Sequence, residues 1–170
     1  MVKVSVVIPT YNRLARLKNV LANLERQSYP HDAFEVVVVS DGSSDGTVEF
    51  LLNLETELNF VFEDQENQGA AAARNKGVEL ASGEYILFLD DDVVPDSDLV
   101  RVHMAYHANG DGNLVVLGPM LTPTDYTMPP WVSWEQRMLY KQYDDMTTGR
   151  WQPTARQFYT GNASLARTYL

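Results

Sequence analysis

The chain of 170 residues contains no cysteine, so it can form no disulfide, bind no metal through thiolates and use no thiol nucleophile. Basic residues are also few: 13 lysines and arginines stand against 23 aspartates and glutamates, which gives a formal net charge of −10. This excess disfavours nucleic acid or an anionic membrane as the main partner. An acidic protein that binds an anionic ligand also needs a cation close to that ligand.

Long apolar runs are absent as well. No segment approaches the ~18 consecutive apolar residues that a membrane-spanning helix needs, and the first residues resemble a strand and not a signal peptide. We therefore expect a cytoplasmic protein without a transmembrane segment, at most peripheral to a membrane. A hydrophobic content of 45% suffices for one core, so we expect a single domain over residues 1–170.

Segments typical of strands and helices alternate through residues 1–118. This alternation predicts an α/β fold with a mostly parallel central sheet and helices on both faces. After Gly118, prolines and aromatic residues become frequent, and one helix is expected from Trp131 to Tyr143. The expected strands are Val2–Ile8, Phe34–Val39, Phe60–Phe62, Tyr85–Leu89 and Leu114–Leu117.

The fourth expected strand runs directly into three carboxylates, Asp90, Asp91 and Asp92. Their mutual repulsion raises the energy of the ionised state unless a cation or hydrogen-bond donors lie among them. If the strand geometry continues, Asp90 and Asp92 point to one side and Asp91 to the other. Such a pair of hard oxygen ligands suits Mg²⁺ or Mn²⁺. On this segment alone, a solvated acidic loop explains the pattern equally well.

Polar residues follow the other expected strands too. In an open parallel sheet, ligands bind outside the carboxyl ends of the strands, and Thr10, Tyr11 and Asp41 fall there together with the three aspartates. Taken singly, Thr10 could cap a helix, Asp41 could form a turn and Arg74 could be a solvated helix residue. Together they predict one pocket that contains an aromatic ring, a hydrogen-bonding carboxylate, a cation and a pair of metal-binding acids.

Several other kinds of site are not supported. The chain has neither the GxxxxGK[ST] phosphate loop nor GxGxxG after its first strand, and it has no GxSxG nucleophile motif. His103 and His107 are four residues apart, as in some zinc sites, but no HExxH motif or third ligand accompanies them. We therefore expect these histidines on an exposed helical face.

Four segments follow one another in the chain: Val4–Arg13 (VSVVIPTYNR), Val37–Thr47 (VVVSDGSSDGT), Asn67–Gly77 (NQGAAAARNKG) and Ala81–Pro95 (ASGEYILFLDDDVVP). In this order and at these distances they resemble the family 2 glycosyltransferases, which have a GT-A fold. The match covers most of residues 1–118, and Thr160–Arg167 (TGNASLAR) resembles a later segment near the acceptor side. The resemblance implies a nucleotide-sugar-binding half over 1–118, the start of an acceptor-side half over 119–170, and a domain that is incomplete at its C-terminus. A nucleotidyltransferase of related fold fits less well, because its glycine-rich basic loop is missing.

The resemblance assigns roles to residues at the ends of the first two strands. Pro9, Thr10 and Tyr11 match the loop that lines the nucleotide pocket. Asp41 matches the carboxylate that accepts a hydrogen bond from the base, typically uracil, and Arg74 matches a basic residue close to that base. These matches imply a nucleoside-diphosphate sugar as donor, with a UDP-sugar expected from the habit of the family.

The resemblance also assigns the aspartates. Asp90 and Asp92 match the outer residues of the DxD motif, with Asp90 nearer the ribose and Asp92 nearer the metal, Mg²⁺ or Mn²⁺, and the diphosphate. Asp91 is counted among the nucleotide-sugar-binding residues, with a bond to its own loop as the alternative.

The implied reaction is transfer of the sugar to an acceptor hydroxyl, on a carbohydrate or a lipid-linked molecule, with inversion at the anomeric carbon. The metal stabilises the charge that gathers on the leaving diphosphate, and a general base deprotonates the acceptor. In relatives this base lies beyond the segment matched by Thr160–Arg167, so we expect it beyond Leu170; Asp144 and Asp145 do not align with it. The alternative is a non-catalytic nucleotide-sugar-binding module, or an inactive fragment that lacks the base.

Overall fold

The computed structural model describes residues 2–110, 114–123 and 126–170. Its internal contacts divide the chain into two units, of which the first comprises Met1–Gly118 and Thr160–Leu170 and the second Pro119–Tyr159. From sequence, the boundary is expected near Gly118, with 119–170 together on the acceptor side. In the structure, residues 160–170 return to the first unit as part of its sheet.

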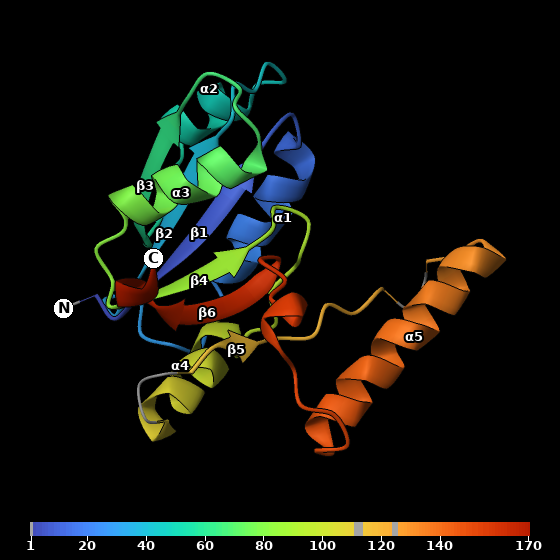
Figure 1. The fold of residues 1–170 in the computed structure, drawn as a ribbon. Coiled ribbons are helices and arrows are strands. Elements are labelled where there is room, and N and C mark those ends of the chain that lie inside the picture. The colour runs from blue at the N-terminus through green and yellow to red at the C-terminus, as the bar shows by residue number, and fades with distance from the viewer. Residues whose placement is uncertain (1, 111–113, 124–125) are drawn as a thin grey trace. The chain divides into compact units, whose positions relative to one another are not determined.

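The first unit is built on a six-stranded sheet in the order β3-β2-β1-β4-β6-β5 (Figure 1). The strands β1 to β4 are parallel, whereas β6 runs antiparallel to both β4 and β5. The expected mostly parallel α/β sheet is thus confirmed, although β6 was not anticipated as a strand. The bounds are β1 Val4–Thr10, β2 Phe34–Ser40, β3 Asn59–Asp64, β4 Tyr85–Leu89, β5 Val116–Leu117 and β6 Asn162–Ala166.

Helices cover both faces of this sheet. Alternate residues of the central strands, such as Val6 and Ile8, pack in one core cluster with apolar residues of α1, α2 and α4. The intervening residue Val7 faces α3, where a Cβ built on Gly77 would lie 2.3 Å from its Cγ1. Gly77 therefore lets α3 approach the sheet closely. The helix bounds are α1 Leu14–Leu24, α2 Thr47–Leu52, α3 Ala70–Leu80 and α4 Leu99–Asn109.

Strand register brings the polar loops to one edge. Thr10 pairs with Ser40 at the end of β1 and β2, and the backbone N–H of Asp41 donates to the carbonyl of Thr10 at 2.9 Å. On the other side of β1, β4 remains paired as far as Phe88. The residues that follow β1, β2 and β4 therefore gather at the carboxyl edge of the sheet.

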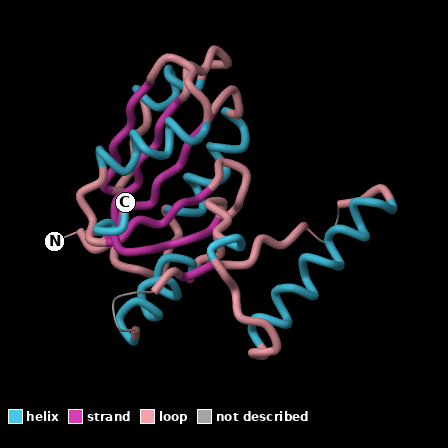
Figure 2. The backbone as a smooth tube through the Cα atoms, in the orientation of Figure 1, coloured by secondary structure: helices cyan, strands magenta, loops and turns pink. Residues whose placement is uncertain are grey.

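The second unit contains one long helix, α5, which spans Pro130–Thr147 (Figure 2). It is longer at both ends than the helix expected from Trp131 to Tyr143, and none of its residues is buried. Its tyrosines hold the preceding segment: the hydroxyl of Tyr140 accepts from the backbone of Thr122 at 2.8 Å. In the parts of the chain that the structure describes, no helix combines the length and apolar character needed to cross a membrane.

Candidate functional site

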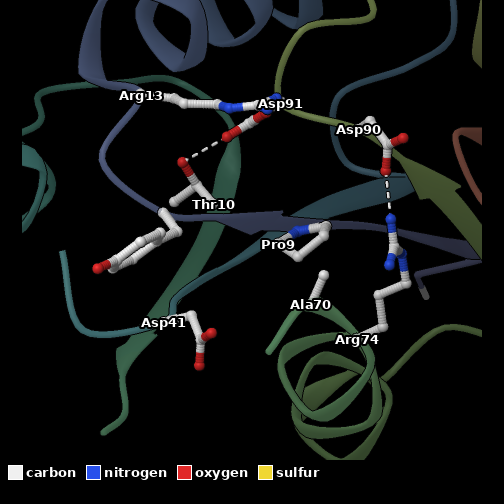
Figure 3. A pocket seen from close by; sticks show the side chains of 9 residues that line it. Pro9, Thr10, Arg13, Asp41, Ala70, Arg74, Asp90 and Asp91 are labelled. Carbon is white, nitrogen blue, oxygen red and sulfur yellow. Dashed lines mark hydrogen bonds and ion pairs between the residues drawn. The ribbon is translucent and has the colours of Figure 1, made fainter. Parts of the chain in front are cut away.

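A cavity of about 310 Å³ opens at the carboxyl edge of the sheet. The cavity collects every residue that the sequence analysis assigned to nucleotide-sugar binding, and it adds Arg13 and Ala70. Asp92, the assigned metal ligand, is not among the lining residues. The lining consists of Pro9, Thr10, Tyr11, Arg13, Asp41, Ala70, Arg74, Asp90 and Asp91 (Figure 3).

Asp41 follows β2 and lines this cavity, where three hydrogen bonds hold its carboxylate. Its Oδ1 accepts from the side chain of Gln65 at 2.7 Å and the backbone of Gln68 at 2.9 Å, while Oδ2 accepts from the backbone of Gly69 at 2.8 Å. Burial acts to raise the pKa of Asp41, but the bonds from Gln68, Gln65 and Gly69 together lower it below its usual value. The carboxylate is therefore ionised, and its Oδ2 retains the capacity to accept one more hydrogen bond.

Asp91 is the buried member of the aspartate triplet, with 4% of its surface exposed. Its Oδ2 accepts from the hydroxyl of Thr10 at 2.7 Å, and its Oδ1 lies 3.1 Å from Nη1 of Arg13. Burial raises the pKa of Asp91, while Thr10 and Arg13 act in the opposite direction. This side chain ties the loop after β4 to the end of β1.

Asp90 pairs with a different arginine. Its Oδ1 lies 2.5 Å from Nη2 of Arg74, which projects from α3 across the cavity (Figure 3). The Nε of Arg74 is buried and has no hydrogen-bond partner within the described residues. An unpaired buried donor is uncommon in folded proteins and calls for an explanation. This nitrogen is itself shielded from solvent, so a ligand in the cavity would reach it only if the Arg74 side chain moved.

Asp92 lies at the outer end of the triplet. Its Oδ2 is 2.8 Å from Nη1 of Arg13 and 2.9 Å from Nη1 of Arg16. The sequence predicts Asp90 and Asp92 on one side of the strand only if the strand continues through them. The strand β4 ends at Leu89 and the next residues turn, so Asp91 and Asp92 share Arg13, whereas Asp90 has its own partner.

The family model described as glycosyl transferase family 2 matches residues 5–170. The chain belongs to glycosyl transferase family 2. The family membership predicted from the four sequence motifs is thereby confirmed.

Sequence relatives of this family 2 chain are longer than the region they share with it. The chain is 39% identical to the uncharacterized glycosyltransferase YfnE of Bacillus subtilis over 117 residues, which cover 68% of the chain and 29% of the relative. It is 43% identical over 116 residues to the validoxylamine A glucosyltransferase of Streptomyces hygroscopicus subsp. jinggangensis, covering 67% and 28%. The matched region thus spans less than a third of these relatives.

Solved structures resemble the fold of this family 2 chain. A mannosyltransferase from Pyrobaculum calidifontis, in complex with GDP-Man and Mn²⁺, matches 98% of the chain and 45% of its own length, with a TM-score of 0.74 and 26% identity. Residues 1–349 of TarS from S. aureus, in complex with UDP-GlcNAc, match 75% of the chain and 37% of that chain, with a TM-score of 0.66 and 30% identity. The expected GT-A fold is confirmed.

Two arginines that contact the aspartates, Arg13 and Arg16, were not singled out from the sequence. Arg13 closes the motif VSVVIPTYNR and Arg16 lies one helical turn later, so both can face the same side of α1. A pair of cations at this spacing, in a chain with few basic residues, was the available signal for a partner of the aspartates. Ala70 carried no comparable signal, because it lines the cavity only through its position at the start of α3.

The histidine prediction was wrong. His103 and His107 are only 2% and 6% exposed, and both contact the hydroxyl of Ser164 on β6 at 2.7 Å. His103 also contacts Oδ1 of Asn162 at 3.0 Å. We call these four side chains the α4–β6 cluster. A zinc site gains no support either: within the described residues, no three acidic or histidine side chains are grouped so as to hold a metal ion.

Proposed function

We propose that this chain is the donor-binding part of an inverting glycosyltransferase that takes its sugar from a nucleoside-diphosphate sugar, with UDP-sugar as the favoured donor. The observation that carries the proposal is the convergence of Pro9, Thr10, Tyr11, Asp41 and the DxD segment on one cavity, in a chain that belongs to family 2. The complexes of neighbouring structures with UDP-GlcNAc and with GDP-Man support a nucleotide sugar as the ligand.

The nucleoside would bind at the β1–β2 end of the cavity. There, Oδ2 of Asp41 would accept an N–H of the base, and the half-exposed ring of Tyr11 offers an apolar face to it. Uracil and guanine both present such an N–H, so Asp41 alone does not choose between them. Arg74 lines the same cavity from α3, where its Nη2 pairs with Asp90.

The diphosphate would lie towards the aspartates. The three aspartates are not grouped so as to hold an ion by themselves, but the exposed carboxylate of Asp92 and the oxygens of a bound diphosphate together would offer the hard ligands that Mg²⁺ and Mn²⁺ prefer. We assign the ion to Asp92, which is more exposed than Asp91, and the Mn²⁺ in the mannosyltransferase complex supports this choice of chemistry. When bound, the ion supplies Lewis-acid stabilisation of the leaving group.

We propose a hydroxyl on a carbohydrate or a lipid-linked molecule as the acceptor. No residue of 1–170 aligns with the general base of family members, so we assign that role to none of them.

Thermal unfolding tests the donor proposal, because a ligand that binds the folded state stabilises it by mass action. UDP or GDP at about 100 times its dissociation constant should add roughly 2.7 kcal/mol to the free energy of unfolding. The stabilisation should require Mn²⁺ or Mg²⁺ and should fall strongly in Asp92→Asn. Asp96→Asn, a matched change at an exposed aspartate of the same loop, should behave like the wild type. Absence of stabilisation by every nucleoside diphosphate with metal would contradict the proposal.

A further inference from the structure

The aspartate triplet is neutralised by three arginines from other elements. Each carboxylate has at least one guanidinium partner, so the group carries three negative and three positive charges in a chain whose net charge is −10. The positive charges of these arginines offset the repulsion among the three adjacent carboxylates. The pairs are Asp90–Arg74, Asp91–Arg13, Asp92–Arg13 and Asp92–Arg16.

The pairs on Asp92 are the ones that can open. The side chains of Arg13 and Arg16 are 48% and 61% exposed and that of Asp92 is 34% exposed, whereas Asp91 is 5% exposed and also bonded to Thr10. Ion pairs between exposed side chains contribute little stability and are readily exchanged. A divalent cation that approaches Asp92 would meet two guanidinium groups already in place.

Arg13 and Arg16 differ in one respect that separates their roles. Arg13 lines the cavity, while Arg16 does not. A guanidinium displaced from Asp92 within the cavity can turn to the phosphate oxygens of a ligand there, which it can bind with two parallel hydrogen bonds. Because Arg16 lies outside the cavity lining, it would not gain a phosphate oxygen as a new partner.

We propose a partner exchange at this site, which rests on the proposed function. Without ligands, Arg13 and Arg16 occupy Asp92 and compete with the divalent cation. When a divalent cation and a diphosphate bind together, Asp92 would coordinate the cation in place of its two arginines, and Arg13 would form its ion pair with the diphosphate. The positive charge of the ion and the negative charge of the diphosphate offset each other, so the site stays close to neutral throughout. Arg13 is then a diphosphate-binding residue, and Arg16 is a counter-charge that tunes metal affinity.

Binding of Mn²⁺ alone tests the first half of the exchange. Free Mn²⁺ is measured by electron paramagnetic resonance during titration of the protein without nucleotide. Arg13→Ala and Arg16→Ala should each bind Mn²⁺ roughly two- to fivefold more tightly, because a competing exposed ion pair has been removed. Arg26→Ala makes the same change in net charge at an exposed position away from the aspartates and should leave the affinity unchanged.

Nucleotide binding tests the second half. In calorimetric titrations with UDP, and in parallel with GDP, at saturating Mn²⁺, Arg13→Ala should weaken binding roughly tenfold or more, since a charge-assisted pair with phosphate is lost. Arg13→Lys keeps the positive charge but lacks the planar guanidinium, so its nucleotide affinity should lie between those of the wild type and Arg13→Ala. Arg16→Ala should change nucleotide affinity less than about twofold.

The outcomes separate this inference from the proposed function. If the wild type binds no nucleoside diphosphate with metal, the proposed function fails. If it binds one, but Arg13→Ala and Arg16→Ala leave Mn²⁺ affinity at the level of Arg26→Ala, the competition is refuted. If Arg13→Ala binds nucleotide as the wild type does, the transfer of Arg13 to the diphosphate is refuted while the donor site stands.

Discussion

Two groups of polar side chains contact the same sheet: the aspartates with their arginines at its carboxyl edge, and the α4–β6 cluster. They differ in charge and in exposure to solvent. The aspartates and arginines at the carboxyl edge are held mainly by ion pairs, and all of them except Asp91 are partly exposed. The α4–β6 cluster is uncharged, and its four members are at most 6% exposed. Ion pairs at an open edge can exchange partners with a ligand, whereas a closed network of neutral hydrogen bonds fixes one strand to one helix.

The hydrogen bonds of the α4–β6 cluster are satisfied by one assignment of protons to its two neutral histidines. Oδ1 of Asn162 can only accept, so Nε2 of His103 donates to it. Nδ1 of the neutral His103 then accepts from the hydroxyl of Ser164, whose oxygen in turn accepts from Nε2 of His107. Both histidines therefore carry their proton on Nε2. A further proton on His103 would face a hydroxyl that already points towards it.

The largest effect that distinguishes the two clusters is expected from pH. Burial lowers the pKa of His103 to about 4 from 6.5, with Asn162 raising it and His107 lowering it. Between these values the unfolded chain binds a proton that the folded chain does not, so stability falls as pH drops from about 6.5 to about 4, by roughly 3 kcal/mol. Denaturant unfolding at a series of pH values measures this loss.

The control for this prediction is His103→Gln, which removes the titrating group. Its free energy of unfolding at pH 7 is expected to be lower, but its decline between pH 6.5 and 4 should be shallower by up to about 1.4 kcal/mol per pH unit. Parallel curves for the variant and the wild type would show that the cluster does not titrate as described.

The next effect concerns the hydroxyl that joins the two histidines. Ser164→Ala leaves Nδ1 of His103 and Nε2 of His107 without this partner in a buried site, which should cost roughly 2 kcal/mol of stability at pH 7. Urea unfolding of the variant measures the cost. Ser44→Ala, which removes an exposed hydroxyl, should change stability by less than about 0.5 kcal/mol. Equal stability of the two variants would mean that the cluster is not a closed network.

The acidic residues at the carboxyl edge were predictable from sequence, whereas their partners Arg13 and Arg16 and the α4–β6 cluster were not. Asp41 and Asp90 follow apolar strands directly, so the rule for parallel sheets places them at one edge without knowledge of the tertiary fold. The partner of His103 is Ser164, 61 residues away, on a strand that is rich in small and polar residues. A helical histidine pair has the same spacing whether it faces water or a strand, so only the fold could decide its burial.

The aspartates show a second limit of the sequence. Side-chain alternation holds only while a strand continues, and β4 ends at Leu89. The turn that follows gives Asp91 and Asp92 a common partner in Arg13, which no period-two pattern predicts. The position of the three aspartates at the edge of the sheet was therefore predictable from sequence, but the ion pairs that their side chains form were set by the turn.

The smallest effect should come from breaking an ion pair of the aspartates without any ligand. Arg16→Ala removes one exposed ion pair with Asp92, and such pairs contribute about 0–1 kcal/mol. Alanine also favours the helix α1 more than other residues do, which offsets part of the loss. Urea unfolding should therefore place Arg16→Ala within about 1 kcal/mol of the wild type. A loss as large as that of Ser164→Ala would mean that the arginines are fixed parts of the fold, and an exchange with metal would then be too costly to occur at this edge.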